Sequence, residues 1–217
     1  MALSDYCNAK PVVMLHQMIF STNRPVINRL RVCWAPCMLL LAVLCSLANT
    51  STARDNPASL EYEIKAAFLY KFGQYVDWPE NSFENKESPI VIGVAASADF
   101  VGILRSATSH RSIHNRPIEV RQITDGDPGQ PHPGQLHLLF IGRSHDQQIQ
   151  RLISQTRGTP TLIITENNAG LDYGGVIGFI IEDERVRFDI NLTAAQQRDL
   201  YISAQLLKVA RVVRGAP

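Results

Sequence analysis

The sequence predicts an α/β fold: a mixed, partly parallel sheet of about five or six strands with helices on both faces, which is a three-layer sandwich. Two observations predict it. The order strand, helix, strand occurs twice, over residues 90–123 and 136–166, and such units form right-handed crossovers between parallel strands. The short runs 89–95 and 136–142 are almost wholly apolar, as expected of strands covered on both faces.

The first 48 residues have the pattern of a secretory signal peptide. Three arginines precede the apolar run MLLLAVLC (38–45), and small residues follow it, so that cleavage fits after Ala48 or after Ala53. The run falls short of the roughly 20 apolar residues of a stable membrane span, and an uncleaved anchor is the alternative. We expect a signal peptide over 1–48, a linker over 49–58 and a single α/β domain over 59–214, exported to the periplasm.

Composition limits what the exported domain can do. The chain of 217 residues is 45% apolar and 19% charged, as in folded globular proteins, and its net charge of +1 gives no reason to expect nucleic-acid binding. The predicted signal peptide holds all four cysteines, four of the 21 basic residues and one of the 20 acidic residues. The remainder therefore has 17 basic and 19 acidic residues, a net charge of −2, and no thiol for a disulfide, a thiolate metal site or a cysteine nucleophile.

The first element of the domain is a helix predicted over 59–79 and ended by Pro79. Apolar residues at spacings of three and four give it one broad face: Leu60, Ile64, Ala67, Phe68, Phe72 and Tyr75. Lys71 falls inside this face. Either its stem lies along the core while its ammonium reaches water, or it is the buried partner of a carboxylate.

The later elements follow from the same periodicities. A helix is expected over 98–107, a strand open to water on one side over 116–123, a Pro/Gly loop over 125–135 and a buried strand over 136–142. Ser144 and Gln147 form a capping box for the next helix. A strand over 161–166, a turn-rich stretch and a hairpin precede a final segment over 193–213, helical except near 200–202, where Ser203 can cap the last piece.

The hairpin raises the question of an active site, because Glu182, Asp183 and Glu184 are consecutive and Asp189 follows closely. Adjacent carboxylates can bind a metal or form an acid/base pair. Over 185–192, however, apolar and polar residues alternate, which places Arg185, Arg187 and Asp189 on the water-facing side. The three acids are then the solvated turn of an antiparallel hairpin, and the sequence predicts no catalytic and no metal-binding residue there.

Other candidate sites are incomplete. His110 and His114 have the spacing of a helical zinc pair but straddle the end of a helix, and His132, His137 and His145 lie in separate elements. No GxSxG elbow, P-loop or dinucleotide fingerprint is present. Arg143 and Ser144 stand at a helix N-terminus that could hold a small anion; simple capping is the alternative.

Several segments resemble the YfiR-like family: KAAFLYKFGQYVDWP (65–79), PIVIGVA, LHLLFIG, the long run 161–195 and ISAQLLKVARVV. The resemblance covers essentially all of residues 60–213. The resemblance implies a periplasmic regulator, not an enzyme and without a cofactor, that represses a membrane-anchored diguanylate cyclase. Such a regulator controls cyclic di-GMP signalling and biofilm-type behaviour, and an outer-membrane lipoprotein is its antagonist. The partner can also be another inner-membrane signalling protein.

We expect the contact surface to include Tyr75 and Trp78 at the exit of the first helix and the polar strand face of Arg185, Arg187 and Asp189. The alternative function is a periplasmic domain that senses a small ligand near residues 142–144 and acts with a different membrane partner. A metal-dependent hydrolase is a third hypothesis. The sequence leaves the oligomeric state open, a homodimer included.

Overall fold

The computed structural model describes residues 57–124 and 135–215, which belong to the second of the chain's two units, Arg54–Pro217. The predicted signal peptide, both cleavage points, His132 and most of the Pro/Gly loop lie outside the described residues. The helices are α2 (Pro57–Gln74), α3 (Ala98–Thr108), α4 (Ile149–Gln155), α5 (Ala169–Asp172), α6 (Leu192–Gln196) and α7 (Ala204–Val209), with 3₁₀ turns η1 (Glu80–Ser82) and η3 (Arg143–Gln148). The strands are β1 (Val76–Asp77), β2 (Ile90–Ala95), β3 (Ser112–Ile113), β4 (Arg116–Gln122), β5 (Leu138–Ile141), β6 (Leu162–Thr165), β7 (Ile177–Glu182), β8 (Arg185–Asn191), β9 (Tyr201–Ile202) and β10 (Val212–Arg214).

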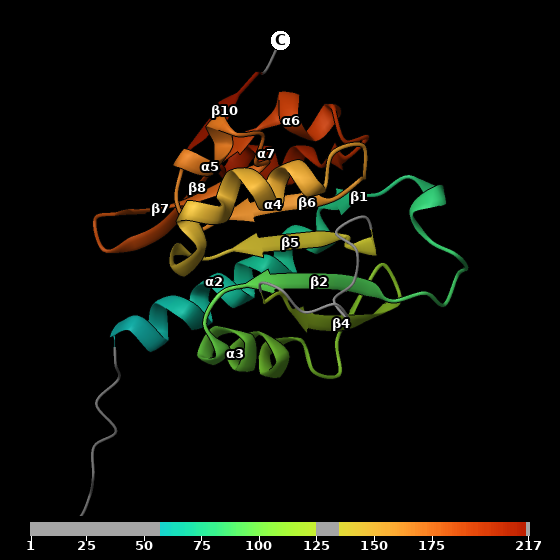
Figure 1. Cartoon of the computed structure of the whole chain (residues 1–217), viewed down its shortest axis with the longest axis horizontal. Coiled ribbons are helices and arrows are strands. Elements are labelled where there is room, and N and C mark those ends of the chain that lie inside the picture. Colours follow the sequence, from blue (N-terminus) through green and yellow to red (C-terminus); the bar gives the residue numbers. More distant parts are fainter. Residues whose placement is uncertain (1–56, 125–134, 216–217) are drawn as a thin grey trace, which may run out of the picture. The chain divides into compact units, whose positions relative to one another are not determined.

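One eight-stranded sheet organises the domain, in the order β10-β8-β7-β6-β5-β2-β4-β3 (Figure 1). The five strands from β7 to β4 are parallel, β8 runs antiparallel to β7, β10 pairs parallel with β8, and β3 pairs antiparallel with β4. This confirms the predicted mixed, partly parallel sheet. The strand number is larger than predicted because the edge strands β3 and β10 have only two and three residues, too few to show a periodicity.

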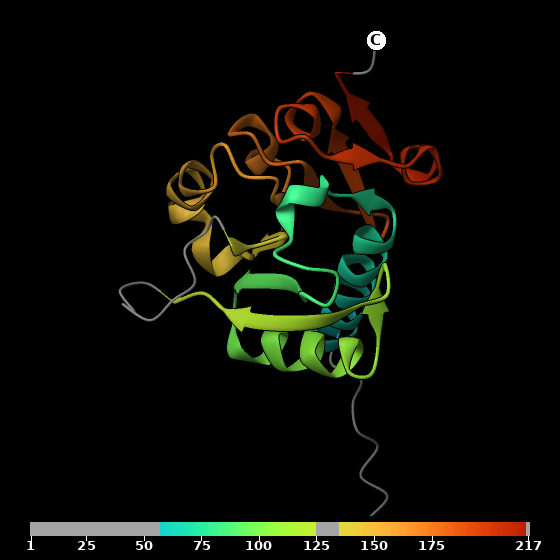
Figure 2. The same ribbon diagram turned by 90° about the vertical axis from the view of Figure 1, so that its right-hand side faces the viewer.

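Alternate residues of the central strands enter different cores, so that helices cover both faces. Ile92 and Val94 of β2 pack in the larger core with α2 and α3, whereas Val91 and Ala95 pack in a smaller core with α4. Figure 1 shows α4 in front of the sheet and α2 behind it, and Figure 2 gives the same layers from the side. The period of two along a buried strand thus produces the three-layer arrangement.

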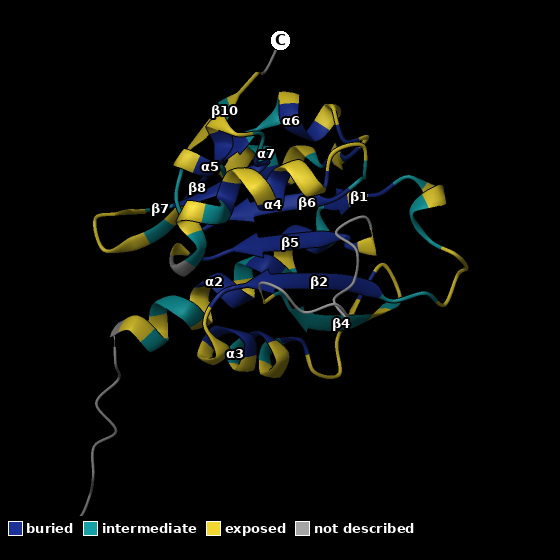
Figure 3. Ribbon diagram, viewed as in Figure 1, coloured by how far each residue is buried: buried dark blue, intermediate teal, exposed yellow. Residues whose placement is uncertain are grey.

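Helix α2 ends at Gln74 and not at Pro79, because residues 76–77 form β1, which pairs with β9. The predicted buried face is correct at Phe72 but wrong near the start of the helix. The fully buried side chains of α2 are Lys65, Ala66, Leu69 and Phe72, whereas Leu60 and Ile64 are 54% and 38% exposed and Lys71 is exposed. The start of α2 extends past the end of the sheet (Figure 3), which leaves Leu60 and Ile64 exposed, whereas Tyr62 packs edge-on against Phe100 of α3.

An aromatic cluster fixes the C-terminal half of α2 to the β7–β8 hairpin. The Phe72 ring lies 4.9 Å from the Phe188 ring, and Phe68 lies 5.6 Å from Phe188 and 6.0 Å from Phe179 (centroid distances). The two pairs with Phe188 are edge-to-face, and such pairs add about 0.5–1.5 kcal/mol each to the free energy of burial. The hairpin face that carries Phe179 and Phe188 therefore points toward α2. Ile181 and Val186 lie on the same face of the hairpin.

Two later helical predictions need correction. The helix expected from Ser144 is a 3₁₀ turn (η3) before α4 begins at Ile149, so Ser144 lies inside η3 and not at a helix N-cap. The segment 193–213 is broken into α6, β9, α7 and β10. Its end forms β10 because Val212 and Val213 extend along β8. Ser203 caps α7 as predicted, accepting a hydrogen bond from the amide of Leu206.

Candidate functional site

The two ends of the parallel strands hold different groups of polar residues. The strand order reverses between β2 and β5, because the chain passes from β2 to β4 on one side and from β5 to β6 on the other. In open α/β sheets the carboxyl ends of the strands at such a reversal form the usual ligand crevice. Here Ala96, Gly142 and Glu166 directly follow β2, β5 and β6 at that end.

A buried ion pair fills this crevice. Lys65 of α2 has no exposed surface, and its Nζ lies 2.7 Å from Oε1 of Glu166, which is itself 7% exposed. The Nζ also bonds to Glu61, one helical turn earlier. A lysine without exposed surface is tolerated only when such partners are present. The buried lysine that pairs with a carboxylate is therefore Lys65 and not the predicted candidate Lys71.

Glu166 also takes the position that a bound anion would occupy. Its Oε2 accepts a hydrogen bond from the backbone amide of Arg143, at the start of η3, over 2.7 Å. Gly142 makes this approach possible, since a Cβ there would lie 2.9 Å from the Cβ of Ala96 and 3.1 Å from Oε2 of Glu166. The Arg143 amide, where an anion was predicted to bind, thus donates to the carboxylate of Glu166 from the same protein.

A small cavity of about 170 Å³ remains beside the ion pair, lined by α2, the start of α3, Arg143 and Glu166. The side chain of Arg143 is exposed and its Nη2 lies 3.8 Å from Oε1 of Glu61. Positive and negative groups are balanced here, with two lysine or arginine side chains and two carboxylates. The charged groups of the crevice therefore bind one another.

The acids of the hairpin form a turn, as predicted. Glu182 pairs with Arg185, so Asp183 and Glu184 are the two turn residues, and both are exposed with positive φ (49° and 58°). Two consecutive residues of positive φ are characteristic of a type I′ hairpin turn. Arg185 and Arg187 are exposed. They share the hairpin face opposite to α2.

Asp189 differs from its prediction, because it is 1% exposed. Arg211 donates to both of its carboxylate oxygens, over 2.9 and 2.6 Å, and the side-chain amide of Asn168 donates over 2.7 Å. Alternation along β8 places Asp189 on the face of Arg187, but Arg211 and the loop before α5 cover that face at this point. The polar face of β8 reaches water only in its first half.

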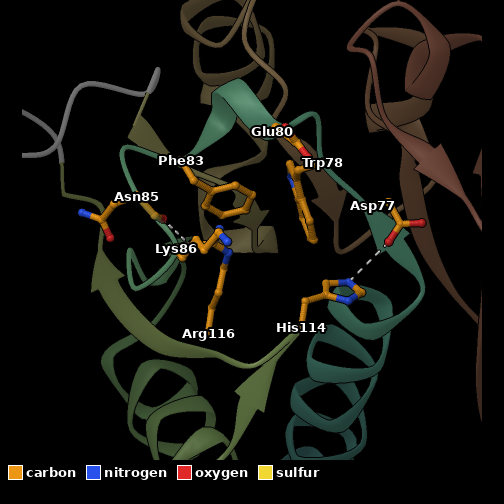
Figure 4. A pocket seen from close by; sticks show the side chains of 8 residues that line it. All are labelled: Asp77, Trp78, Glu80, Phe83, Asn85, Lys86, His114 and Arg116. Atoms are coloured by element: carbon orange, nitrogen blue, oxygen red, sulfur yellow. Dashed lines mark hydrogen bonds and ion pairs between the residues drawn. The ribbon is translucent and has the colours of Figure 1, made fainter.

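The amino end of the sheet carries an open pocket, which we call the Trp78 pocket (Figure 4). It has a volume of about 520 Å³ and is lined by Asp77, Trp78, Glu80, Phe83, Asn85, Lys86, His114 and Arg116. Trp78 is 9% exposed, and its Nε1 donates to the carbonyl oxygen of His137 over 3.1 Å. Tyr75, half-buried, lies just before β1, and its carbonyl accepts from the Ser203 amide. Trp78 and Arg187 therefore lie at opposite ends of the sheet, and the predicted contact residues do not form one surface.

A buried histidine anchors the loop that forms the Trp78 pocket. Nδ1 of His137 accepts from the Val91 amide over 3.1 Å, so Nε2 carries the proton and donates to the carbonyl of Ser82, also over 3.1 Å. Its ring stacks on Phe83, with centroids 4.6 Å apart. Burial lowers the pKa of His137 below its ordinary value, the hydrogen bond to Ser82 opposes this, and the charge of Arg116 adds to the lowering.

The other histidines are dispersed. His110 and His114 both have positive φ in the turns around β3 and do not share a helix face; Nε2 of His114 lies 3.0 Å from the Val76 carbonyl and 3.7 Å from Asp77. Among residues 57–124 and 135–215, no three His, Cys, Asp or Glu side chains converge as a metal site. In the same residues, no helix is long and apolar enough to cross a membrane.

The chain matches the model of a known protein family. A family model described as YfiR/HmsC-like matches residues 62–211, from α2 to the segment before β10. The chain belongs to the YfiR/HmsC-like family. The family consists of periplasmic regulatory proteins linked to cyclic di-GMP signalling, and its members are not known as enzymes. No curated protein sequence matches the chain.

One solved structure of low identity shows a similar fold. A conserved domain protein from Vibrio cholerae O1 biovar El Tor superposes with a TM-score of 0.51 at 11% identity, over 70% of this chain and 60% of that one. An ABC domain in complex with L-Trp from Streptococcus pneumoniae gives a TM-score of 0.46 at 12% identity, over 68% and 60% of the two chains. This YfiR/HmsC-like chain thus spans about 60% of the length of each.

Several residues at the two ends of the sheet were not predicted from the sequence. Glu166 could have been found, because a charged residue directly after a buried parallel strand stands where α/β sheets bind ligands. Lys65 carried a weaker signal, its spacing of four from Glu61. Phe83, Arg116 and His137 carried no signal, since they come together only through the long loop between β1 and β2.

Proposed function

We propose that the protein is a periplasmic repressor that binds a membrane-anchored diguanylate cyclase and so lowers cyclic di-GMP inside the cell. Membership of the YfiR/HmsC-like family supports this proposal. Export through the N-terminal signal peptide, action by binding and not by catalysis, and an outer-membrane lipoprotein as antagonist are parts of the same proposal.

One structural observation carries the choice of contact surface. Leu60 and Ile64 of α2 and Ile181 of the hairpin are large apolar side chains that are 54%, 38% and 41% exposed. We call these three residues the apolar end patch. Exposed apolar surface of this kind is characteristic of contact sites between proteins.

The three residues belong to the same side of the sheet. Along α2, Ile64 lies one turn before Phe68, and along β7, Ile181 follows Phe179 on the same face. Because Phe68 contacts Phe179 and the two elements run in opposite directions, both continue outward from this contact toward the carboxyl end. Figure 1 shows the start of α2 and the hairpin tip extending past the sheet on the same side.

A repressor needs to bind one state of its partner better than the other. A difference of about 1–3 kcal/mol is enough to change a signalling equilibrium by one to two orders of magnitude. Burial of three large apolar side chains provides a free energy of this order. Arg185 and Arg187, on the opposite face of the hairpin, are proposed as flanking polar contacts, and Tyr75 and Trp78 as part of a separate region.

The test uses Leu60→Asp combined with Ile64→Asp. Both positions are exposed, and the helix dipole favours an acid at position 60 near the start of α2, so we expect the melting temperature to stay within a few degrees of wild type. The variant should no longer co-purify with an inner-membrane cyclase, and cyclic di-GMP should rise to the level of a deletion strain. Val209→Asp is the matched control, since Val209 is an exposed apolar residue of α7.

If the double variant still lowers cyclic di-GMP as well as wild type, the apolar end patch is not the contact surface. If deletion of the protein leaves cyclic di-GMP unchanged, the partner is not a cyclase. A second candidate function, sensing of a small ligand with a different membrane partner, is favoured by the open Trp78 pocket.

A further inference from the structure

We infer that the Trp78 pocket binds a small organic anion with a flat ring, such as an aromatic carboxylate. This inference goes beyond the repressor function and does not depend on it. The pocket is about three times as large as the crevice cavity, roughly 520 against 170 Å³. Its volume lies within the range of small-molecule sites, about 300–1,000 Å³.

The site holds a fixed cation. Nη1 of Arg116 donates to the carbonyl oxygens of Asn85 and Ser88 over 2.7 and 3.0 Å, and its guanidinium carbon lies 3.8 Å from the centre of the Phe83 ring. These contacts hold the planar guanidinium in place before any ligand binds. A pre-positioned arginine recognises carboxylates well because its remaining N–H donors lie in one plane and keep their charge.

A second cation, Lys86, lines the same pocket as Arg116. Figure 4 draws both side chains on the Phe83 side of the pocket. Lys86 is exposed. Two positive groups at one point of a concave surface raise the local concentration of anions.

Trp78 provides an apolar surface on the opposite side of the pocket. Trp78 faces Phe83 across the opening in Figure 4, and the hydrogen bond of its Nε1 to His137 holds the indole ring in place. The His114 ring meets it edge-on, with centroids 6.4 Å apart. A flat ring could stack on Trp78 while its carboxylate reaches the free N–H donors of Arg116.

The acidic groups of the pocket lie on the Trp78 side. Asp77 lies 3.7 Å from Nε2 of His114, and Glu80 is exposed at the rim. The charge of the ligand is therefore recognised at Arg116 and Lys86, while its ring contacts Trp78. A cation of the same shape would meet Arg116 and Lys86 and be repelled.

The test is a titration with benzoate, using benzylamine as the cationic analogue, benzyl alcohol as the neutral one and acetate as the anion without a ring. The chain has two tryptophans, Trp34 and Trp78, so full-length protein with Trp34→Phe reports on Trp78 alone by fluorescence. Titration calorimetry up to about 10 mM covers the affinity expected of such a fragment. We expect saturable binding of benzoate with a change in Trp78 emission, and at least tenfold weaker binding of the other three probes.

Variants distinguish an effect on ligand binding from an effect on folding. Lys86→Gln, at an exposed position, should weaken benzoate binding about threefold to tenfold without a change in melting temperature, and Arg116→Gln by more than tenfold. Lys208→Gln, on exposed α7, is the matched control and should bind as wild type. The inference is overturned if benzoate leaves Trp78 emission unchanged, if benzylamine binds equally well, or if Lys86→Gln and Lys208→Gln bind alike.

Discussion

At the carboxyl end of the sheet, charged side chains are directed inward and satisfy one another: Lys65 is enclosed by Glu166 and Glu61, and the Arg143 amide is bonded to Glu166. At the amino end, charged groups line an open pocket with Trp78 as its apolar wall. The common position for a ligand in an α/β sheet is thus filled by the protein itself. The reversal of strand order therefore locates a crevice in the sheet. The side chains around the crevice determine whether a ligand can bind there.

The largest expected effect comes from removing the carboxylate at the closed end. Glu166→Ala leaves Lys65 buried without its principal partner, which destabilises the fold by about 3–5 kcal/mol. Urea unfolding of this variant beside the exposed control Glu63→Ala, expected within about 0.5 kcal/mol of wild type, measures the effect.

The double variant Lys65→Met with Glu166→Gln sharpens this prediction. Because it removes both charges together, it should recover most of the loss. If Glu166→Ala costs less than about 1 kcal/mol, the crevice is not held closed by this ion pair, and the contrast between the two ends fails.

A smaller effect is expected at the open end, through His137. Its pKa is lowered in the folded protein, chiefly by burial and further by Arg116. The unfolded chain therefore takes up a proton first as the pH falls below about 6.5. Stability is complete above that pH and decreases below it, with a slope from this one group of at most about 1.4 kcal/mol per pH unit.

Urea unfolding between pH 8 and 5, compared with His137→Gln, isolates this contribution. The variant should be less stable at neutral pH and less dependent on pH than wild type. Equal slopes for wild type and His137→Gln would contradict the lowered pKa of His137.

The smallest effect concerns the hairpin at the closed end. Asp183 and Glu184 both have positive φ, which favours Asn-Gly in a type I′ turn. Asp183→Asn with Glu184→Gly should therefore raise stability by up to about 1 kcal/mol and leave cyclic di-GMP control unchanged. Glu184→Ala keeps a Cβ at the strained position and should not stabilise. Loss of repression in the Asn-Gly variant would show that the acids act in binding and not only as a turn.

Periodicity predicted the part of the fold that repeated contacts determine. The apolar runs of β2, β5 and β6 gave parallel central strands, and the alternation over 185–192 gave the hairpin with its acidic turn. The prediction of buried residues failed at the start of α2, which extends beyond the sheet. Leu60 and Ile64 have core-like spacing, but the end of α2 lies beyond the sheet, and the helix instead buries Lys65 because Glu166 meets it there.

The polar sites were less predictable, because each is assembled from distant segments. Asp189 was expected in water, and only the return of the chain at Arg211 and Asn168 encloses it. The Trp78 pocket joins the loop after α2 to the turn before β4. Trp78 was identified from its position after the first helix, yet neither its bond to His137 nor the stacked Arg116 follows from local sequence.

The small ribbon of β1 and β9 has a consequence for the order of assembly. It joins residues that follow the first helix of the domain to residues near its C-terminal end, so the fold cannot close until almost the whole polypeptide has been released. Long-range closure of this kind slows folding, a property that fits the proposed export of the chain in an unfolded state.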